Sequence, residues 1–350
     1  MRTVIFIPPL SWVSGGLAAI YRLALALHEL GYALSLTSTT RNVPGLANLL
    51  ERGIGFLPWQ GLKLNRSDLW LVPESHPNAL AVGLHGGARI LVYVQNWYYL
   101  LSSLPENVYW EQLPVEFLAV SHPVAWFMEK SLRLRVRGIL PPAVAQCFFQ
   151  AEQQRAKHLR IAFMPRKNAA LGRQMREVAT AALGPGSRIS LEWVPLDKRP
   201  LEEVARELAL SHIFLSTGFP EGFGLPPAEA MAAGCIPVGF TGFGGWEYAR
   251  PAKINAVGVK TPLLQPPCDL PYDLAPNGFY VADGDTLAGG LALAGAIRMF
   301  QQEDGSMDTL RACALEAAAL FTEELQKKRV QQIWAGLEQE LPRLRPDSAP

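Results

Sequence analysis

The stretch that most constrains this chain runs from Ser216 to Gly239 and reads STGFPEGFGLPPAEAMAAGCIPVG. The apolar residues 213–215 before it predict a buried strand, and residues 228–233 within it predict a helix that ends at Gly234. A glycine-rich loop that opens a helix brings backbone N–H groups and the positive helix end to one place, which suits an anion. The order strand, loop, helix therefore predicts an α/β fold with a ligand at this loop.

Two carboxylates in the same stretch ask for a second kind of ligand group. Glu221 and Glu229 have seven residues between them, and Gly222 and Gly224 leave backbone amides uncovered near Glu221. Carboxylates repel phosphate, but they accept hydrogen bonds from hydroxyl groups. The stretch therefore predicts a ligand that carries both phosphates and sugar hydroxyls.

Length and composition indicate a two-domain globular protein without a metal site. The chain has 350 residues, of which 49% are hydrophobic and 18% are charged, so a single core is too small for it. Its four cysteines are far apart and form no CxxC pair: Cys147, Cys235, Cys268 and Cys313. We expect reduced thiols, no bound metal and no cofactor.

The termini and apolar segments predict a cytoplasmic protein. Residues 2–8 lead directly into a strand-like run, without the basic start, apolar stretch and cleavage site of a signal peptide. No window reaches the roughly 18 apolar residues of a membrane-spanning helix. We expect a soluble protein and leave open whether it also contacts a membrane peripherally.

The case for membrane contact depends on an uneven distribution of charge along the chain. The net charge is +1, but residues 1–160 hold 14 Lys/Arg against 9 Asp/Glu, and residues 161–350 hold 18 against 22. The densest basic patch is residues 130–137, KSLRLRVR, in the N-terminal domain. It fits an anionic membrane surface or an acidic acceptor, or equally a solvated helix end followed by a strand with outward arginines. We expect no nucleic-acid partner.

The first half opens with a strand, helix, strand pattern. Residues 3–7 predict a strand, residues 17–30 a helix with one apolar face, and residues 32–38 the next strand. Gly15 and Gly16 lie at the helix entrance, where amides can approach a diphosphate or an acceptor; the alternative is a tight turn. The dinucleotide fingerprint GxGxxG is missing, which disfavours an oxidoreductase.

Polar residues follow three further predicted strands of the first half, at residues 69–72, 90–94 and 117–120. Alternating strands and helices predict a parallel, doubly wound sheet, whose ligands gather at the carboxyl ends of the strands. The polar residues at these ends are Glu74, Ser75, His76, Gln95, Asn96, Ser121 and His122, followed after Asn96 by the aromatic run Trp97, Tyr98 and Tyr99. Each polar residue is alternatively a helix cap or a turn residue, and the aromatic residues are compatible with stacking on sugars or with a core position.

A break in the pattern at residues 141–154 predicts the domain junction. We expect an N-terminal domain at residues 1–150, a C-terminal domain at 151–325, and a final helix at 326–350 that is long enough to return to the first domain. The second domain starts with a strand at 160–163, and Arg166 and Lys167 follow it. Two cations at a strand end fit a diphosphate, or they belong to a basic loop before the predicted helix 169–183.

Residues 160–290 resemble family 4 of the glycosyltransferases, which are retaining enzymes of the GT-B fold. The segment FPEGFGLPPAEAMAAGCIPVG is similar to that family's E-x7-E signature, and GFGGWEY and NGFYVADGD look like its next two landmarks. The first half resembles the family mainly through the SGG loop before its first long helix. The resemblance implies two Rossmann-like domains that face a central cleft: an N-terminal acceptor-binding domain, residues 1–150, and a C-terminal domain, residues 151–325, that binds a nucleoside-diphosphate sugar donor.

The resemblance also implies roles for single residues. Glu229 would bind the ribose hydroxyls, and Glu221 would face the hydroxyls of the donor sugar beside the reacting carbon. Arg166 and Lys167 take the place of the family's basic pair on the diphosphate, although MPRKN departs from the usual spacing. The remaining donor contacts implied are Gly15, Gly16, Leu196 near the nucleobase, and Gly222, Phe223, Gly224 and Leu225 near sugar and phosphate.

The expected reaction is metal-independent transfer with retention, to a glycan, lipid-linked or small-molecule acceptor in polysaccharide biosynthesis. The first domain departs from the family at VQNWYY, where many members have a histidine. Gln95 and Asn96 can donate hydrogen bonds there, with Ser121 and His122 as further sugar contacts, but only His122 can act as acid or base. The alternatives are a catalytically silent partner that binds nucleotide sugar, and a sugar-nucleotide epimerase of the same fold.

Overall fold

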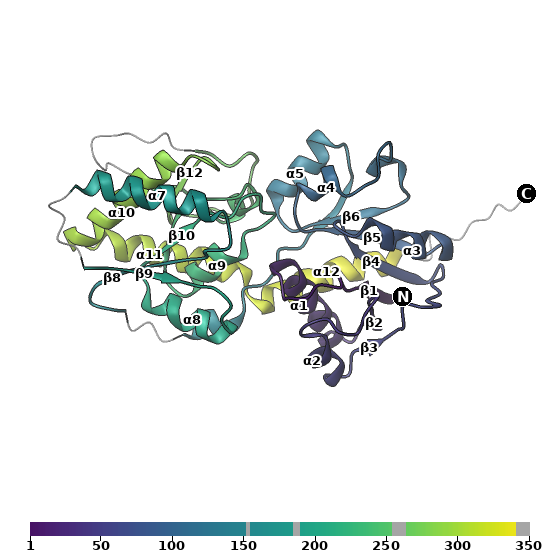
Figure 1. Cartoon of the computed structure of the whole chain (residues 1–350). Coiled ribbons are helices and arrows are strands. Elements are labelled where there is room, and N and C mark those ends of the chain that lie inside the picture. Colours follow the sequence, from purple (N-terminus) through teal and green to yellow (C-terminus); the bar gives the residue numbers. More distant parts are fainter. Residues whose placement is uncertain (152–154, 185–189, 254–263, 341–350) are drawn as a thin grey trace, which may run out of the picture. The chain divides into compact units, whose positions relative to one another are not determined.

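A computed structural model describes residues 1–151, 155–184, 190–253 and 264–340 of the chain, and these form two compact units (Figure 1). Unit 1 is Met1–Ala143 together with the chain from Glu323 onward, and unit 2 is Val144–Thr322. The boundaries therefore lie at 143/144 and 322/323, where the sequence placed them at 150/151 and 325/326.

Unit 1 is built on a sheet of seven parallel strands in the order β3-β2-β1-β4-β5-β6-β7. The strands are β1 (Arg2–Phe6), β2 (Leu34–Thr37), β3 (Gly55–Phe56), β4 (Asp68–Pro73), β5 (Arg89–Val94), β6 (Glu116–Ala119) and β7 (Val136–Ile139). All residues of β4 are buried, as expected for a central strand covered on both faces. The strand order reverses between β1 and β4, which makes their carboxyl ends the switch point of this sheet.

Helices pack against both faces of this sheet (Figure 1): α1 (Gly15–Glu29), α2 (Leu46–Glu51), α3 (Leu80–Gly86), α4 (Tyr99–Ser102), α5 (His122–Ser131) and α12 (Glu323–Glu340), with short 3-10 turns at Pro77–Ala79 and Trp110–Gln112. Helix α1 starts two residues before the predicted Leu17, because the Ser14 side chain accepts a hydrogen bond from the Leu17 backbone N–H and caps it. Its buried face carries the predicted leucines and Ile20.

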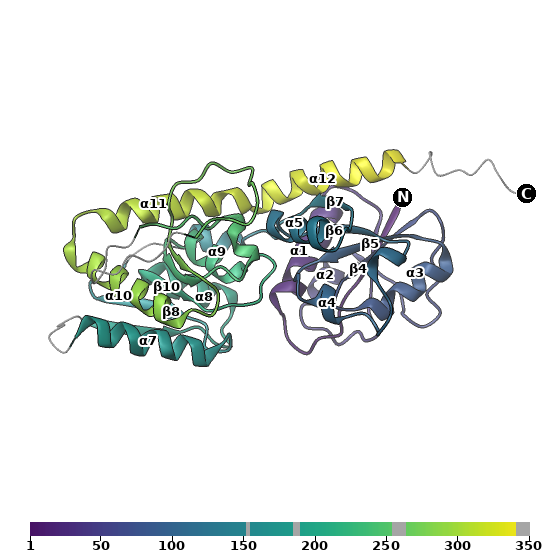
Figure 2. The same cartoon turned by 90° about the horizontal axis from the view of Figure 1, so that it is seen from above.

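The C-terminal helix α12 belongs to unit 1 (Figure 2). The indole N–H of Trp334 donates to the Thr3 hydroxyl at 2.9 Å, and Gly138 of β7 leaves space for the Ile333 side chain, which a Cβ there would approach to 3.1 Å. The sequence predicted a final helix at residues 326–350; α12 begins three residues earlier, and residues 341–350 lie outside the described ones. Helix α11 (Ser306–Ala318) and a 3-10 turn (Ala319–Phe321) stay in unit 2, and α12 starts after an extended residue, Thr322.

Unit 2 is built on five parallel strands in the order β12-β11-β10-β8-β9. They are β8 (Leu159–Phe163), β9 (Leu191–Pro195), β10 (Ile213–Ser216), β11 (Ile236–Phe240) and β12 (Phe279–Val281); the predicted start of β9 at Ile189 lies outside the described residues. The strand order reverses between β8 and β10. The carboxyl ends of these two strands are therefore the switch point of the second sheet.

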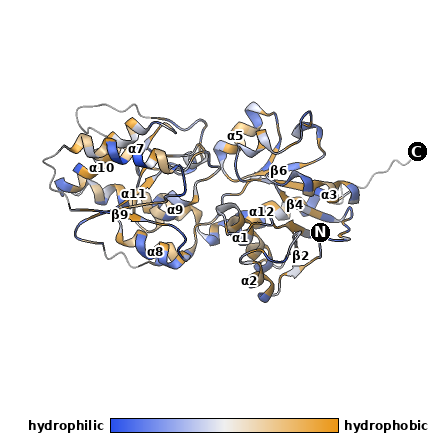
Figure 3. Ribbon diagram, viewed as in Figure 1, coloured by the Kyte–Doolittle hydropathy of each residue, from blue (hydrophilic) through white to orange (hydrophobic). Residues whose placement is uncertain are grey.

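The helices of unit 2 form two groups. Helices α7 (Ala169–Leu183) and α10 (Thr286–Gln302) pack closely, because Gly289 and Gly290 leave room for Met175 and Val178, where a Cβ would come within 2.5 and 2.4 Å. The other group is α6 (Gln146–Gln150), α8 (Leu201–Leu210), α9 (Leu225–Ala232) and α11, with a 3-10 turn at Gly244–Glu247. Helices α7 and α8 carry both hydrophobic and hydrophilic residues (Figure 3), as expected for helices with one buried face.

The predicted fold class, two parallel α/β domains, is confirmed by both sheets. Helix α9 begins at Leu225, three residues before the predicted Ala228, because Pro226 and Pro227 occupy its first turn, where a helix needs no N–H donor and the proline φ already fits. None of the helices in the described ranges is long and apolar enough to cross a membrane.

Candidate functional site

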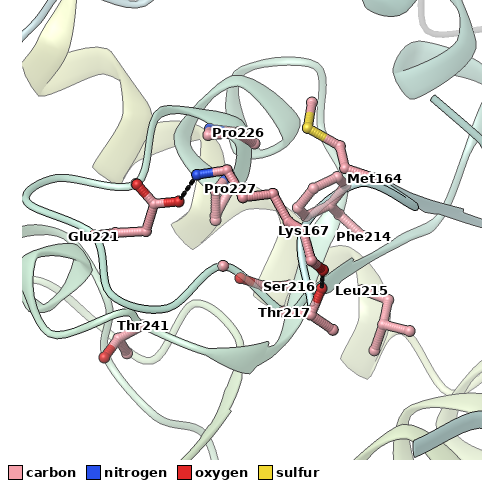
Figure 4. Close-up of a pocket in the computed structure, with 12 residues that line it drawn as sticks. Met164, Lys167, Phe214, Leu215, Ser216, Thr217, Glu221, Pro226, Pro227 and Thr241 are labelled. Atoms are coloured by element: carbon pink, nitrogen blue, oxygen red, sulfur yellow. Dashed lines mark hydrogen bonds and ion pairs between the residues drawn. The ribbon is translucent and has the colours of Figure 1, made fainter. Parts of the chain in front are cut away.

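A pocket lies at the switch point of unit 2 (Figure 4). Its lining surrounds about 340 Å³ of space, which includes the solvent at its open mouth. Its lining comes from β10, from the loops after β8, β10 and β11, and from the start of α9: Met164, Lys167, Phe214, Leu215, Ser216, Thr217, Gly218, Glu221, Gly224, Pro226, Pro227 and Thr241. Two of the predicted catalytic residues, Lys167 and Glu221, are among them.

Three hydrogen bonds join the loop after β8 to the loop after β10. The Thr217 hydroxyl donates to the Lys167 carbonyl at 2.6 Å, and the Asn168 side-chain amide donates to the carbonyls of Thr217 and Phe219 at 2.8 and 3.1 Å. Asn168 has a φ of 51°, in the left-handed region that asparagine tolerates. The sequence analysis did not identify Asn168 or Thr217 as site residues, although an asparagine directly before the helix was a visible signal.

Lys167 and Glu221 form an ion pair across the pocket, between Nζ and Oε1 (Figure 4). The backbone of Glu221 is fixed as well: its N–H donates to the Gly242 carbonyl at 2.8 Å, and its carbonyl accepts from the Gly244 N–H at 3.0 Å. A cation and a carboxylate thus face one space. Such a pair can divide between a phosphate and a hydroxyl group of one ligand.

Glycines make room for Glu221. A Cβ on Gly218 would lie 2.9 Å from Glu221 Oε1, and a Cβ on Gly242, which has a φ of 68°, would lie 2.6 Å from Glu221 Cβ. At Gly244 a Cβ would meet the Gly222 carbonyl oxygen at 1.9 Å. The second glycine-rich loop, residues 241–245, is therefore a close-fitting wall behind the first.

Asp283, at the carboxyl end of β12, holds this second loop. Its Oδ1 accepts the Gly242 N–H at 2.9 Å. Burial raises the pKa of Asp283 to about 6, and hydrogen bonds from backbone N–H groups of residues 241–243 oppose that rise. The sequence analysis noted Asp283 only as a strand-end residue. Its part in positioning the loop beside Glu221 depends on the pairing of β11 with β12.

The start of α9 has no side-chain cap. Gly224 is the N-cap residue, with a φ of 77°, and its carbonyl accepts the Tyr248 hydroxyl at 2.6 Å. Because Pro226 and Pro227 lack an N–H, the first turn of α9 has Leu225 as its N–H donor before Ala228. An anion at this helix start would meet the backbone rather than a competing side chain.

Glu229 lies one turn into α9, 8% exposed and outside the pocket lining. The pKa of Tyr248 is raised well above its usual 10 by burial first, and then by the charges of Tyr280, Glu221 and Glu229. Both carboxylates of the E-x7-E pattern thus act on one tyrosine, from two sides of the glycine-rich loop.

The other predicted donor residues fall into two groups. Arg166 is exposed and is not part of the pocket lining. Leu196 is buried, with its N–H on the Phe163 carbonyl at 2.8 Å, and Phe223 is buried against the rings of Tyr248 and Phe321. Gly222 and Leu225 are also buried. Of the predicted basic pair, the pocket therefore contains the lysine alone.

In unit 1 three of the predicted residues, Gly15, Gly16 and Gln95, lie at the entrance of α1. The Gln95 side-chain amide donates to the Gly16 carbonyl at 2.9 Å, and a Cβ on Gly16 would lie 2.6 Å from Gln95 Oε1. Gly15 is the first residue of α1, and the Ser14 hydroxyl already accepts from the Leu17 N–H at 3.1 Å. The two glycines therefore serve a close approach to Gln95 at a capped helix start.

Next to this contact lies a buried carboxyl group. Glu74 is 1% exposed, and its Oε1 accepts the Asn96 N–H at 2.8 Å. Burial raises the pKa of Glu74 to about 7, against the backbone hydrogen bonds from Gln95 and Asn96. Ser121 is fully buried and caps α5 through the Val124 N–H at 3.3 Å, and His122 is the first residue of that helix. Ser121 thus has the helix-cap role that the sequence left as an alternative.

The basic patch at residues 130–137 is not a uniform cationic surface. Lys130, Arg133 and Arg135 are exposed, but Arg137 forms ion pairs with Glu116 at 2.6 Å and with Glu340 of α12. Arg137 therefore fastens the C-terminal helix to the sheet. This arrangement favours the structural interpretation of the patch over a membrane contact.

No family model matches the chain. In a comparison with curated proteins, 67 residues are 37% identical to "Putative glycosyltransferase ORF330" of Acidianus filamentous virus 2 (isolate Italy/Pozzuoli). This match covers 19% of the present chain and 20% of the viral protein. The chain thus spans about a fifth of the length of that relative.

Solved structures resemble the whole chain. Sucrose-phosphate synthase from Thermosynechococcus elongatus has a TM-score of 0.66 at 14% identity, covering 97% of this chain and 100% of its own. A glycosyltransferase from Rickettsia africae ESF-5 has a TM-score of 0.64 at 13% identity, with coverages of 98% and 99%. Anabaena HepE, solved in complex with UDP and glucose, has a TM-score of 0.63 at 13% identity, with coverages of 97% and 100%. The architecture that these structures share is the GT-B fold, and the present chain has it.

Proposed function

We propose that this chain is a retaining glycosyltransferase, which moves a sugar from a nucleoside-diphosphate sugar to a glycan, lipid-linked or small-molecule acceptor. The observation that carries the proposal is the pocket at the switch point of unit 2, where Lys167 and Glu221 face each other beside a glycine-rich helix start. HepE, a protein of the same fold, was solved with UDP and glucose, which supports the same ligand class here.

In the proposed reaction Lys167 binds the phosphates of the donor. Departure of a nucleoside diphosphate builds negative charge, and Lys167 leaves Glu221 to neutralise it, with the Leu225 N–H at the start of α9 as a backbone donor. A preorganised donor of this kind is typically worth about 3–4 kcal/mol in the transition state. With this charge supplied by the chain itself, the proposed transfer is metal-independent.

The two carboxylates, Glu221 and Glu229, bind the hydroxyl groups of the donor. Once Lys167 turns to the phosphates, Glu221 is free to accept hydrogen bonds from the donor sugar, because Gly218 and Gly242 hold it at the pocket wall. Glu229, buried in α9 behind the loop, is assigned to the ribose. The ion pair between Lys167 and Glu221 is thereby replaced by two separate contacts with one ligand, from Lys167 to the phosphates and from Glu221 to the sugar.

Retention follows if the acceptor attacks from the face that the leaving group departs from. The acceptor oxygen bonds to the reacting carbon, the bond from that carbon to the phosphate oxygen breaks, and this phosphate oxygen takes the acceptor's proton. No protein base is needed on this route. A residue such as Gln95 at the β5 end is compatible with this route, because an amide side chain does not act as a general acid or base.

Thermal shift with a panel of nucleoside diphosphates and their sugars tests the proposal, because a ligand of the folded state raises the melting temperature. We expect one base to stand out and donor hydrolysis or transfer to follow with the matching sugar. Absence of any shift across the panel would overturn the donor assignment.

A second function, a catalytically silent partner that binds nucleotide sugar, is favoured by one observation. Gln95 stands at the β5 end, with its amide engaged by Gly16. Binding of a donor without hydrolysis, and without transfer to any of a range of simple sugars, would select this alternative.

A further inference from the structure

The switch point of unit 1 differs in charge from the pocket of unit 2. The segments that follow β1, β4, β5 and β6 are residues 7–14, 74–76, 95–98 and 120–122, all within the described ranges, and they contain one Asp, Glu, Lys or Arg, namely Glu74. Glu74 is buried and bound to the Asn96 N–H. A phosphate or carboxylate ligand would therefore find no lysine or arginine in these four segments.

The same segments, together with the first residue of α4, expose aromatic rings. Trp12, in the loop before α1, is 58% exposed, and Tyr98 and Tyr99, after β5, are 48% and 45% exposed. Aromatic rings pack well on the C–H faces of sugars, while the indole N–H and phenol O–H can bond to hydroxyls. Large rings exposed at the end of a parallel sheet, where ligands gather, thus favour a sugar.

The loop that carries Tyr98 is held in place by several contacts. The Trp97 ring packs edge to face with Tyr98 at 6.0 Å and with Phe127 at 5.7 Å, and the Asn96 side chain accepts the Tyr98 N–H at 3.0 Å. The Gln95 to Gly16 hydrogen bond ties this loop to the start of α1, four residues after Trp12. Rings held in place lose little entropy when a ligand stacks on them.

We infer that this edge of unit 1, made of Trp12, Gln95, Tyr98 and Tyr99, binds an uncharged sugar. In the reaction proposed above, on which this naming of the ligand rests, the acceptor is then a neutral glycan or glycoside rather than a phosphorylated or acidic molecule. Stacking supplies the affinity, and the polar rims of the rings supply the hydrogen bonds. The diphosphate is left to the unit that holds Lys167.

The experiment uses the full chain and calorimetric titration with neutral tetrasaccharides (maltotetraose, cellotetraose and chitotetraose) against tetragalacturonate and glucose 6-phosphate, with and without saturating UDP. We expect at least one neutral probe to bind at least tenfold more tightly than the charged probes. Trp12→Ala and Tyr98→Ala should each weaken it about 3- to 10-fold, the range for one aromatic contact.

Leu84→Ala is the matched control. Leu84 is also an exposed apolar residue of unit 1, but it lies in the last turn of α3, which leads to the amino end of β5, at the opposite edge of the sheet. It should leave sugar affinity unchanged, and all three variants should keep the melting temperature and the UDP affinity of the wild type.

The outcomes separate the two proposals. Tighter binding of tetragalacturonate or glucose 6-phosphate, equal losses in Leu84→Ala, or no neutral probe bound would each overturn the inference. Loss of UDP binding in the wild type, with neutral sugar still bound, would overturn the proposed transferase function and leave the sugar edge standing.

Discussion

The two sheets of this chain have the same parallel architecture but opposite chemistry at their switch points. In unit 2 the loops after β8 and β10 bring Lys167 and Glu221 together over glycines. In unit 1 the loops after β1 and β5 bring Trp12 and Tyr98 to an edge whose one carboxyl is buried. Under the two proposals above, the shared fold sets where a ligand binds, and the loops set which ligand it is.

The two edges nevertheless share one feature, a carboxyl group with a raised pKa that accepts a hydrogen bond from a backbone N–H of the neighbouring loop. Glu74 does this for Asn96 in unit 1, and Asp283 does it for Gly242 in unit 2. Burial raises the pKa of Glu74 to about 7 and that of Asp283 to about 6. In both units the carboxyl positions a loop, but Glu74 is buried whereas Asp283 is partly exposed.

The largest expected effect tests the charged edge. Lys167→Ala should lower the rate of transfer about 100- to 1000-fold, because one preorganised donor to the leaving phosphate is lost. Steady-state kinetics with the matching donor measure it. Arg166→Ala is the control from the same loop: Arg166 is exposed outside the pocket, and we expect less than about a 3-fold change, as for solvent-screened charges. Equal losses in both variants would restore the basic pair that the sequence predicted.

The second prediction concerns the buried carboxyl of the uncharged edge. The folded-state pKa of Glu74 is about 7, above its ordinary 4.5, so the folded state binds this proton more tightly than the unfolded state. Stability should therefore fall as the pH rises from about 4.5 to about 7, by about 3 kcal/mol from this group. Glu74→Gln, which stays neutral, should lack that part of the fall.

Urea unfolding of both proteins at pH 4.5, 6 and 8 measures this difference. Glu111→Gln is the control, because Glu111 is an exposed glutamate of the same unit and its removal should leave the curve unchanged. If the unfolding free energies of the wild type and Glu74→Gln changed with pH in parallel, burial would not raise the pKa of Glu74. The contrast between the two edges would then lose this support.

The third prediction returns to the E-x7-E pattern. Glu229→Ala should raise the dissociation constant for the donor about 10- to 100-fold, the range for losing a hydrogen bond to a charged group, while Glu221→Ala should lower turnover more than affinity. Titration calorimetry with the nucleoside diphosphate alone separates the two, because it carries the ribose but no donor sugar. Unchanged affinity in Glu229→Ala would make the ribose assignment wrong.

Local sequence patterns predicted the helices and strands of both units. They did not predict the contacts between elements that are distant in the chain. The helix at residues 169–183 was predicted with the bounds that α7 has, because its apolar face and the preceding Asn168 are contiguous signals. The pocket depends on β8 lying beside β10, a pairing that no single stretch encodes. For the same reason Thr217 and Asn168 were missed, and Lys167 was not separated from Arg166.

The smallest expected effect distinguishes the helix starts of the two edges. Helix α1 is capped by Ser14, whose hydroxyl accepts the Leu17 N–H, whereas α9 starts at Gly224 with no side-chain cap. Ser14→Ala should cost about 1 kcal/mol of stability, the ordinary value of such a cap, and should leave nucleotide affinity unchanged. Chemical denaturation and calorimetry measure the two quantities. A loss of nucleotide affinity in Ser14→Ala would place the start of α1 in the donor site, as the resemblance implied for Gly15 and Gly16, and the division of ligands between the two edges would then have to be redrawn.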